Sequence, residues 1–256
     1  HYTHSRDLAY VYKLAAHYNT DEKIMDTLAL AEAHGINTLS MHNPPHPMSV
    51  IKRYRKERGG KIQWIICPTA PIEPDMAKYR EAVRQLVEDG CEAVYVWGVQ
   101  SDPLAQQGKV SLIGKAVEVI KDHGVPAGVG CHDLNVVKLC EQNKIPNDFY
   151  IKTFHHHNYP TAPKPEQVKG ATSEYPGYWC SDPKGTAEFM KTVEKPWIAF
   201  KVMAAGAIPP ADAFRYVLDN GADHILAGMF DFEIEEDVRI LKSVLSNANR
   251  TRPWRS

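Results

Sequence analysis

Residues 217–229 read VLDNGADHILAGM and pass from the end of an apolar-faced helix, through Gly221, into a short apolar run. The same junction recurs as AEAHGINTLSM at 31–41, LVEDGCEAVYVW at 86–97 and IKDHGVPAGVG at 120–130. In each copy a glycine follows the helix, where it accepts the left-handed conformation that commonly ends helices. The short apolar runs are typical of buried parallel strands. The sequence therefore predicts a chain of helix–strand units.

Seven strands are expected, over residues 36–42, 61–67, 92–98, 126–132, 148–154, 197–203 and 223–229. Helices alternate with nearly all of them, which indicates a parallel sheet covered by helices. No Gly-x-Gly-x-x-Gly turn follows an early strand, which disfavours an open dinucleotide-binding sheet. Length and unit number favour an α/β fold, a single (β/α)8 TIM barrel over residues 1–256. Because that barrel needs eight strands, we expect the first at or before the N-terminus, trimmed in a chain that begins at His1 without an initiator Met.

Composition excludes several classes of function. The 256 residues carry 30 Lys and Arg against 31 Asp and Glu, for a formal net charge of −1 and no basic block. General nucleic-acid binding needs a concentrated basic surface and is not expected. No apolar run is long enough to span a membrane. The five cysteines are expected to be reduced core residues. A small-molecule substrate is the expected partner, and a homo-oligomer is compatible with the sequence.

In a TIM barrel, catalytic residues collect where strands end, and alternation along each strand decides which side chains point inward. Alternation predicts an inward-facing set made of Thr38, Ser40, His42, Tyr95, Trp97, Gly128, Gly130, His132, Tyr150, Lys152 and Lys201. The two glycines are expected to leave room beneath His132. Residues 155–182 form a long loop over this face, with His155 at its mouth, and such loops often carry function.

The candidate site combines histidines, lysines and aromatic residues. The predicted catalytic residues are Lys152, Lys201 and His132; the predicted substrate-binding residues are Trp97, Tyr95, His156 and Trp179; the predicted metal ligands are His42, His132 and His155. Histidine suits both proton transfer and metal binding. An inward lysine is either a Schiff-base nucleophile, an anion binder or half of a structural ion pair. A lone inward histidine is more often a hydrogen-bonded core residue.

Five segments resemble the aldo/keto reductases. They are TDEKIMDTLALAEAHGINTLSM at 20–41, EAVYVWGVQSDP at 92–103, VPAGVGCHDLNVVKLCEQ at 125–142, DFYIKTFHHHNYP at 148–160 and PWIAFKVMAAGAI at 196–208. The resemblance covers most of the chain and implies a TIM barrel. A segment near the start, HSRDL at 4–8, resembles a bacterial set of such barrels that often carries an upstream export signal. This likeness leaves two cellular compartments open for the protein, the cytoplasm and the periplasm.

The chain departs from the reductases where their chemistry resides. Residues 40–43 lack the family's Asp and Tyr pair. Cys67 ends the strand expected at 61–67, the third of the eight-stranded barrel, where the family has a Lys. Trp97 stands where the fourth strand carries a His, and residues 230–233, FDFE, replace the Ser- and Arg-bearing NADP-phosphate segment. The resemblance thus implies a diverged branch without the reductase tetrad, for which NADP is not expected.

A weaker likeness links the chain to class I aldolases. Those enzymes place a Schiff-base lysine on the sixth strand, where this sequence has YIKT with Lys152. Met203, and not Lys201, falls at their second lysine position, and their paired Asp is missing from VYVWG.

The sequence thus predicts a metal-assisted lyase, isomerase or hydrolase that acts on a small carbohydrate-like or carbonyl substrate. The metal would be zinc, manganese, iron or nickel. Three alternatives stay open: a Schiff-base lyase using Lys152, an NADPH-dependent reductase, and a barrel that binds a ligand without turnover.

Overall fold

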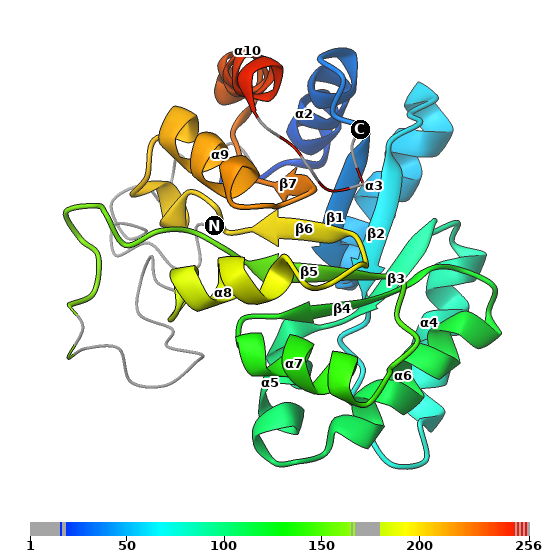
Figure 1. The fold of residues 1–256 in the computed structure, drawn as a ribbon. Coiled ribbons are helices and arrows are strands. Elements are labelled where there is room, and N and C mark those ends of the chain that lie inside the picture. The colour runs from blue at the N-terminus through cyan, green and yellow to red at the C-terminus, as the bar shows by residue number, and fades with distance from the viewer. Residues whose placement is uncertain are drawn as a thin grey trace.

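In the part of the chain that the structure describes, seven parallel strands form one sheet in which each pairs with its neighbour in sequence. The computed structural model describes residues 16, 19–164, 166, 180–248, 250, 252 and 254. The strands are β1 (Thr38–His42), β2 (Gln63–Cys67), β3 (Ala93–Val96), β4 (Ala127–Cys131), β5 (Phe149–Thr153), β6 (Trp197–Phe200) and β7 (His224–Leu226). The sheet curves into a nearly closed barrel ringed by helices (Figure 1), which confirms the predicted TIM-barrel fold. The expected first strand falls on residues outside the described part of the chain.

Helices fill the connections between the strands. They are α2 (Asp21–Ala33), α3 (Pro45–Arg58), α4 (Ala77–Glu88), α5 (Gly98–Gln106), α6 (Val110–Asp122), α7 (Leu134–Gln142), α8 (Pro183–Met190), α9 (Pro210–Asp219) and α10 (Asp231–Asn247), with a short 3-10 turn, η3, at Ala204–Gly206. Thr20 caps α2 by accepting a hydrogen bond from the backbone N–H of Lys23 at 3.3 Å. Among these helices, none combines the length and the apolar character that crossing a bilayer requires.

The glycine junctions form as the sequence predicts. Gly35, Gly90, Gly124 and Gly221 have φ values of +93°, +93°, +78° and +99°. A residue with a Cβ is strained in this region, so these positions end their helices and start the strands sharply. Local chemistry therefore sets where each helix–strand unit turns.

Two apolar layers pack against the sheet. Inside the barrel lie Cys67, Ala93, Tyr95, Phe149 and Ile151, with Phe200 packed against them. The larger outer layer joins the strands to the helices, and all five cysteines are buried and free, as predicted. Because the interior is filled with side chains, chemistry is confined to the ends of the strands.

The predicted facing of β5 and β6 is wrong. Phe149 and Ile151 face the interior, whereas Tyr150 packs outward and its hydroxyl donates to Glu141 of α7 at 2.6 Å. Lys152 shares the face of Tyr150 and so does not point into the barrel. Both faces of these strands are apolar, so hydrophobic alternation carries no information about which side is inside.

The prediction for the β4 glycines is also corrected. A Cβ on Gly128 would lie 2.3 Å from Phe149 Cε2, and one on Gly130 would lie 3.0 Å from Tyr95 Cδ2. The two glycines therefore make room for the interior rings and not for a cavity beneath His132. The inward facing of Tyr95 is confirmed, because its hydroxyl accepts a bond from Ser40 at 3.4 Å.

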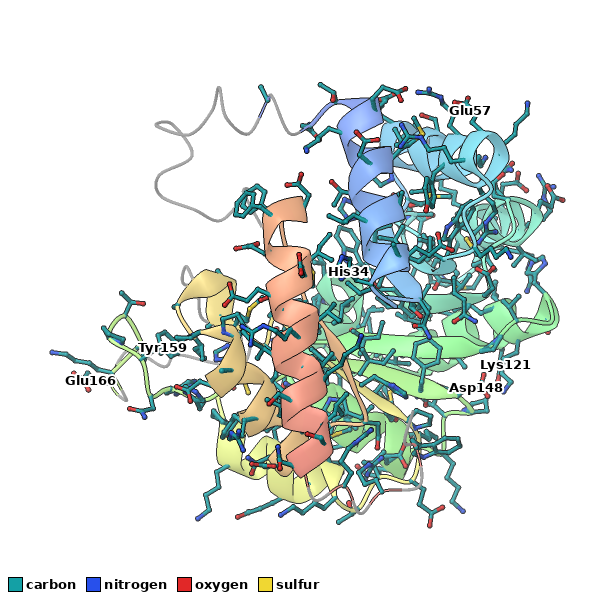
Figure 2. The ribbon with its side chains drawn as sticks, turned by 90° about the horizontal axis from the view of Figure 1, so that it is seen from above. His34, Glu57, Lys121, Asp148, Tyr159 and Glu166 are labelled. Carbon is teal, nitrogen blue, oxygen red and sulfur yellow. The ribbon has the colours of Figure 1, made fainter. Side chains whose placement is uncertain are left out.

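The two ends of the barrel differ in character. Figure 2 shows Lys121 and Asp148 at one end and Tyr159 at the other; Asp148 precedes β5 and Tyr159 follows it. At the strand-start end, Arg252 pairs with buried Asp223 at 2.9 Å, and Asp223 also accepts from the backbone N–H of Trp197 at 2.8 Å. Arg252 further donates to three backbone carbonyls that precede β6, those of Met190, Val193 and Lys195. This end is tied together by structural polar contacts.

Candidate active site

A buried carboxylate holds the histidine at the end of β4. His132 Nδ1 lies 2.7 Å from Asp102 Oδ2. The backbone N–H groups of His132 and Asp133 both donate to Asp102 Oδ1 at 3.0 Å. The Asp102 side chain is only 4% exposed, which makes these charge-assisted bonds stronger than bonds in water. The contact assigns the proton of the neutral ring to Nδ1 and leaves Nε2 as the unprotonated nitrogen.

A lysine faces the other nitrogen of the same ring. Lys201 Nζ lies 3.2 Å from His132 Nε2. Lys201 follows β6 directly and has a φ of +56°, in the left-handed region that side chains rarely adopt. Alternation alone would place Lys201 outward with Ala199, so this backbone turn brings its ammonium to His132. Lys201 and His132 thus lie together as predicted, but the cause is the backbone turn at Lys201 and not the alternation of side chains along β6.

The first turns of α5 supply Asp102. The helix begins at Gly98, immediately after Trp97, and the buried Ser101 hydroxyl donates to the Gly130 carbonyl of β4. Gln100 fixes the outer side of the same turn by accepting from Ile72 N–H at 2.9 Å. The carboxylate is therefore placed by a helix that is bonded to the strand carrying His132, and rigid elements of this kind favour a precise site.

Aromatic rings border the site. Phe200 packs near His132 with ring centroids 5.6 Å apart. His42 stacks on Trp97 with centroids 5.8 Å apart and planes 12° from parallel. His42 is exposed and Trp97 is half-buried, so this pair presents a planar surface at the ends of β1 and β3. Such surfaces suit stacking against the apolar face of a polar ligand.

Lys152 lies apart from this group. It is 1% exposed, and its ammonium donates to the Thr153 carbonyl at 2.7 Å and to the Thr153 hydroxyl at 3.1 Å. A buried ammonium needs such partners, because desolvation otherwise disfavours its charge. The local contacts of Lys152 are those of a structural residue.

The three histidines that follow β5 differ in burial: His155 is buried, whereas His156 and His157 are half-buried. His155 is fully buried, and its Nδ1 lies 3.0 Å from the His156 carbonyl. Burial lowers the pKa of His155 to about 4. His156 packs edge-on against Tyr216 of α9, with centroids 5.0 Å apart, and His157 contacts the Cys180 carbonyl. The predicted position of His155 at the mouth is therefore wrong, and Trp179 lies outside the described residues.

The predicted metal ligands are not assembled. Across the described ranges, no group of three or more His, Cys, Asp and Glu side chains is placed to hold a metal ion. Both nitrogens of His132 already contact Asp102 and Lys201, His155 is fully buried, and His42 stacks on Trp97. The structure thus does not bring His42, His132 and His155 into one ligand set.

The residues at the reductase positions do not fit hydride chemistry. Cys67 ends β2, where its thiol faces the Met41 carbonyl at 3.7 Å, and burial raises its pKa to about 12. A neutral thiol cannot replace the lysine that the resemblance would place there. Trp97 follows β3 in place of a histidine.

Asp102 is the residue that sequence reasoning missed. Its segment, QSDP at 100–103, served only as a mark of resemblance in the fold. The available signal was a carboxylate in the short helix after β3, next to the strand that carries His132. Seeing its role required the packing of α5 on β4, which no local pattern encodes.

Solved structures share this fold. An aldo-keto reductase from Bacillus halodurans, in its holo form, matches with a TM-score of 0.61 and 11% identity, over 93% of this chain and 91% of its own. A Pseudomonas aeruginosa protein assigned to the aldo-keto reductases gives 0.58 at 14% identity, over 88% and 84%. Native KDPGal, an aldolase, gives 0.53 at 10% identity, over 89% and 90%. No protein-family model matches the sequence, and no curated protein matches it significantly. At these identities the likeness shows the fold, and it confirms the predicted resemblance to both groups at that level.

Proposed function

We propose that this protein is a lyase or isomerase that moves protons on a small polar substrate bearing a carbonyl group, with His132 as the general acid and base. The observation that carries the proposal is the position of one imidazole between a buried carboxylate at 2.7 Å and an ammonium at 3.2 Å. This group lies where β4 and β6 end, the face at which TIM-barrel enzymes place their chemistry.

Each member of the group has a distinct role. Asp102 holds the Nδ1–H tautomer and stabilises the imidazolium that forms when Nε2 accepts a proton. Protonation of Nε2 ends its acceptance of a bond from Lys201, because two cationic donors then face one another. The Lys201 ammonium is thereby available to the negative oxygen that develops on the substrate carbonyl. Proton transfer to His132 Nε2 is thereby coupled to stabilisation of the substrate oxyanion by Lys201.

The surroundings favour a compact substrate with an apolar face. Trp97 and His42 stack into a flat aromatic surface where β1 and β3 end, and Phe200 packs near the His132 ring. Sugars and related hydroxy-carbonyl compounds combine such a face with polar edges. The fold neighbours named as aldolase and aldo-keto reductase are, by those names, proteins of carbonyl chemistry.

The other predicted chemistries have direct tests. Assistance by zinc, manganese, iron or nickel stays a prediction, which elemental analysis before and after chelation tests. A Schiff base at Lys152 would be trapped by borohydride in the presence of a carbonyl substrate. We do not favour it, because Lys152 is 1% exposed and bonded to Thr153.

Solvent-proton exchange tests the proposal. A panel of hydroxy-ketones, aldoses and 2-oxo acids is incubated with the protein in D2O, and deuterium entry beside the carbonyl is followed by NMR. We expect exchange with at least one compound, reduced about 100-fold or more in His132→Gln and in Lys201→Met. His46→Gln, at an exposed histidine on α3, is the matched control and should exchange normally. No exchange across the panel, or full exchange in His132→Gln, would contradict the proposal.

A further inference from the structure

Gly98 lies directly against the His132 ring. A methyl group on Gly98 would lie 3.3 Å from both Cε1 and Nδ1 of His132, and 3.4 Å from the Cα of Cys131. The two 3.3 Å distances to the ring are shorter than ordinary van der Waals contact, so the ring would have to move by a few tenths of an ångström. Gly98 is itself buried.

The backbone does not explain the glycine. Gly98 is the first residue of α5, and its φ lies outside the left-handed range. Any residue can adopt this conformation, and alanine is a better helix former than glycine. The His132 ring is therefore the neighbour against which an alanine side chain at this position would press most closely.

The ring has little freedom to give way. Its Nδ1 is held at 2.7 Å from Asp102, its Nε2 at 3.2 Å from Lys201, and Phe200 packs beside it. A shift away from Gly98 changes the bond to Asp102, because the nitrogen that the methyl group would meet is the one that faces the carboxylate.

We propose that Gly98 is a positioning residue for His132: its missing side chain lets the imidazole sit at hydrogen-bond distance from Asp102 and Lys201 together. The effect on turnover rests on the proposed function, whereas the effect on the ring does not. Small displacements of a catalytic group have large kinetic consequences, since a shift of about 1 Å can cost about 100-fold in rate.

The first test compares Gly98→Ala with Gly114→Ala. Gly114 lies in α6, and a Cβ there would be 3.7 Å from Ile145 Cγ1, an ordinary contact. We expect Gly98→Ala to move the 15N shifts of the His132 ring and to lower kcat for deuterium exchange about 10-fold, with KM little changed. Gly114→Ala should leave both unchanged. Unaltered 15N shifts in Gly98→Ala would overturn the inference.

A stability cycle covers the case in which Gly98→Ala folds poorly. His132→Ala removes the ring that the new methyl group would meet, so the drop in urea midpoint caused by Gly98→Ala should shrink in that background. An equal drop in both backgrounds would overturn the inference. If Gly98→Ala moves the ring signals while His132→Gln leaves exchange intact, the positioning holds and the proposed function fails.

Discussion

Replacing Asp102 by Asn separates the charge of this residue from its shape. The carboxylate accepts hydrogen bonds from three donors: His132 Nδ1 at 2.7 Å and the backbone N–H groups of His132 and Asp133, each at 3.0 Å from Oδ1. An amide of the same size has one oxygen, so its NH2 group must face at least one of these donors. The substitution therefore removes a charge-assisted bond and leaves a buried donor unpaired.

The magnitude follows from those two losses. A hydrogen bond to a charged group contributes about 1.5–3 kcal/mol, and a buried unpaired donor costs about 1–3 kcal/mol. Part of this falls on folding and part on the imidazolium formed during turnover. We expect a loss of about 2–4 kcal/mol in the barrier, which corresponds to about 30- to 1,000-fold in kcat.

The assay is deuterium exchange on the substrate found in the panel, with kcat and KM measured separately. Asp133→Asn is the matched control, because Asp133 caps α7 by accepting from Asn135 N–H at 2.7 Å and Asn caps helices equally well. We expect the control to retain wild-type kcat. An Asp102→Asn variant that folds and keeps kcat within about threefold of wild type would refute the role of the buried carboxylate.

Three predictions concern stability. Arg252→Ala should lower the free energy of unfolding by about 3 kcal/mol, because it takes the guanidinium partner from the Asp223 carboxylate, whose side chain is 1% exposed. In urea titrations, Arg239→Ala, at an exposed ion pair, should cost far less. Burial and neighbouring carboxylates raise the pKa of Asp237 to about 6, so the stability that its protonated form contributes is fully present below pH 3.8 and is lost as pH rises through 6. Asp237→Asn should therefore raise the free energy of unfolding by about 1–2 kcal/mol at pH 7 and flatten the dependence of stability on pH. An unchanged pH dependence of stability in this variant would contradict the prediction. The pKa of His155 is lowered to about 4 in the folded protein, so the unfolded chain binds a proton at this histidine more tightly than the folded protein does. The free energy of unfolding should therefore fall as pH drops from 6.5 through 4. An NMR titration that gives His155 a pKa near 6.5 would refute this.

The fold could be predicted because its signals are local. The helices that end at Gly35, Gly90, Gly124 and Gly221, all with positive φ, are each followed by a strand, and a short stretch of sequence contains the whole signal. The facing of β1 and β3 was also readable, since Ser40 and Tyr95 do meet inside the barrel. Alternation failed on β5, where Phe149 and Tyr150 are both large and apolar enough to face either layer.

The site was only partly predictable for a different reason. His132 follows from its place at the end of a strand, but its partners depend on contacts between elements. Asp102 reaches it because α5 packs on β4, and Lys201 reaches it because its backbone adopts a φ of +56°. Neither contact leaves a pattern in the sequence near the residue. A run of histidines drew the metal prediction, yet His155 is buried as a packing residue.

The tautomer of His132 shows most directly whether this histidine can accept a proton at Nε2. It is read from the 15N chemical shifts of the ring in uniformly labelled protein and assigned with His132→Gln. We predict that in the neutral ring Nδ1 carries the proton toward Asp102 and that Nε2 is unprotonated and faces Lys201. Asp102→Asn should reduce the share of this tautomer. A neutral ring protonated mainly at Nε2 in the wild-type protein would contradict the role of His132 as general base, because the ring could then not accept a proton at the nitrogen that faces Lys201.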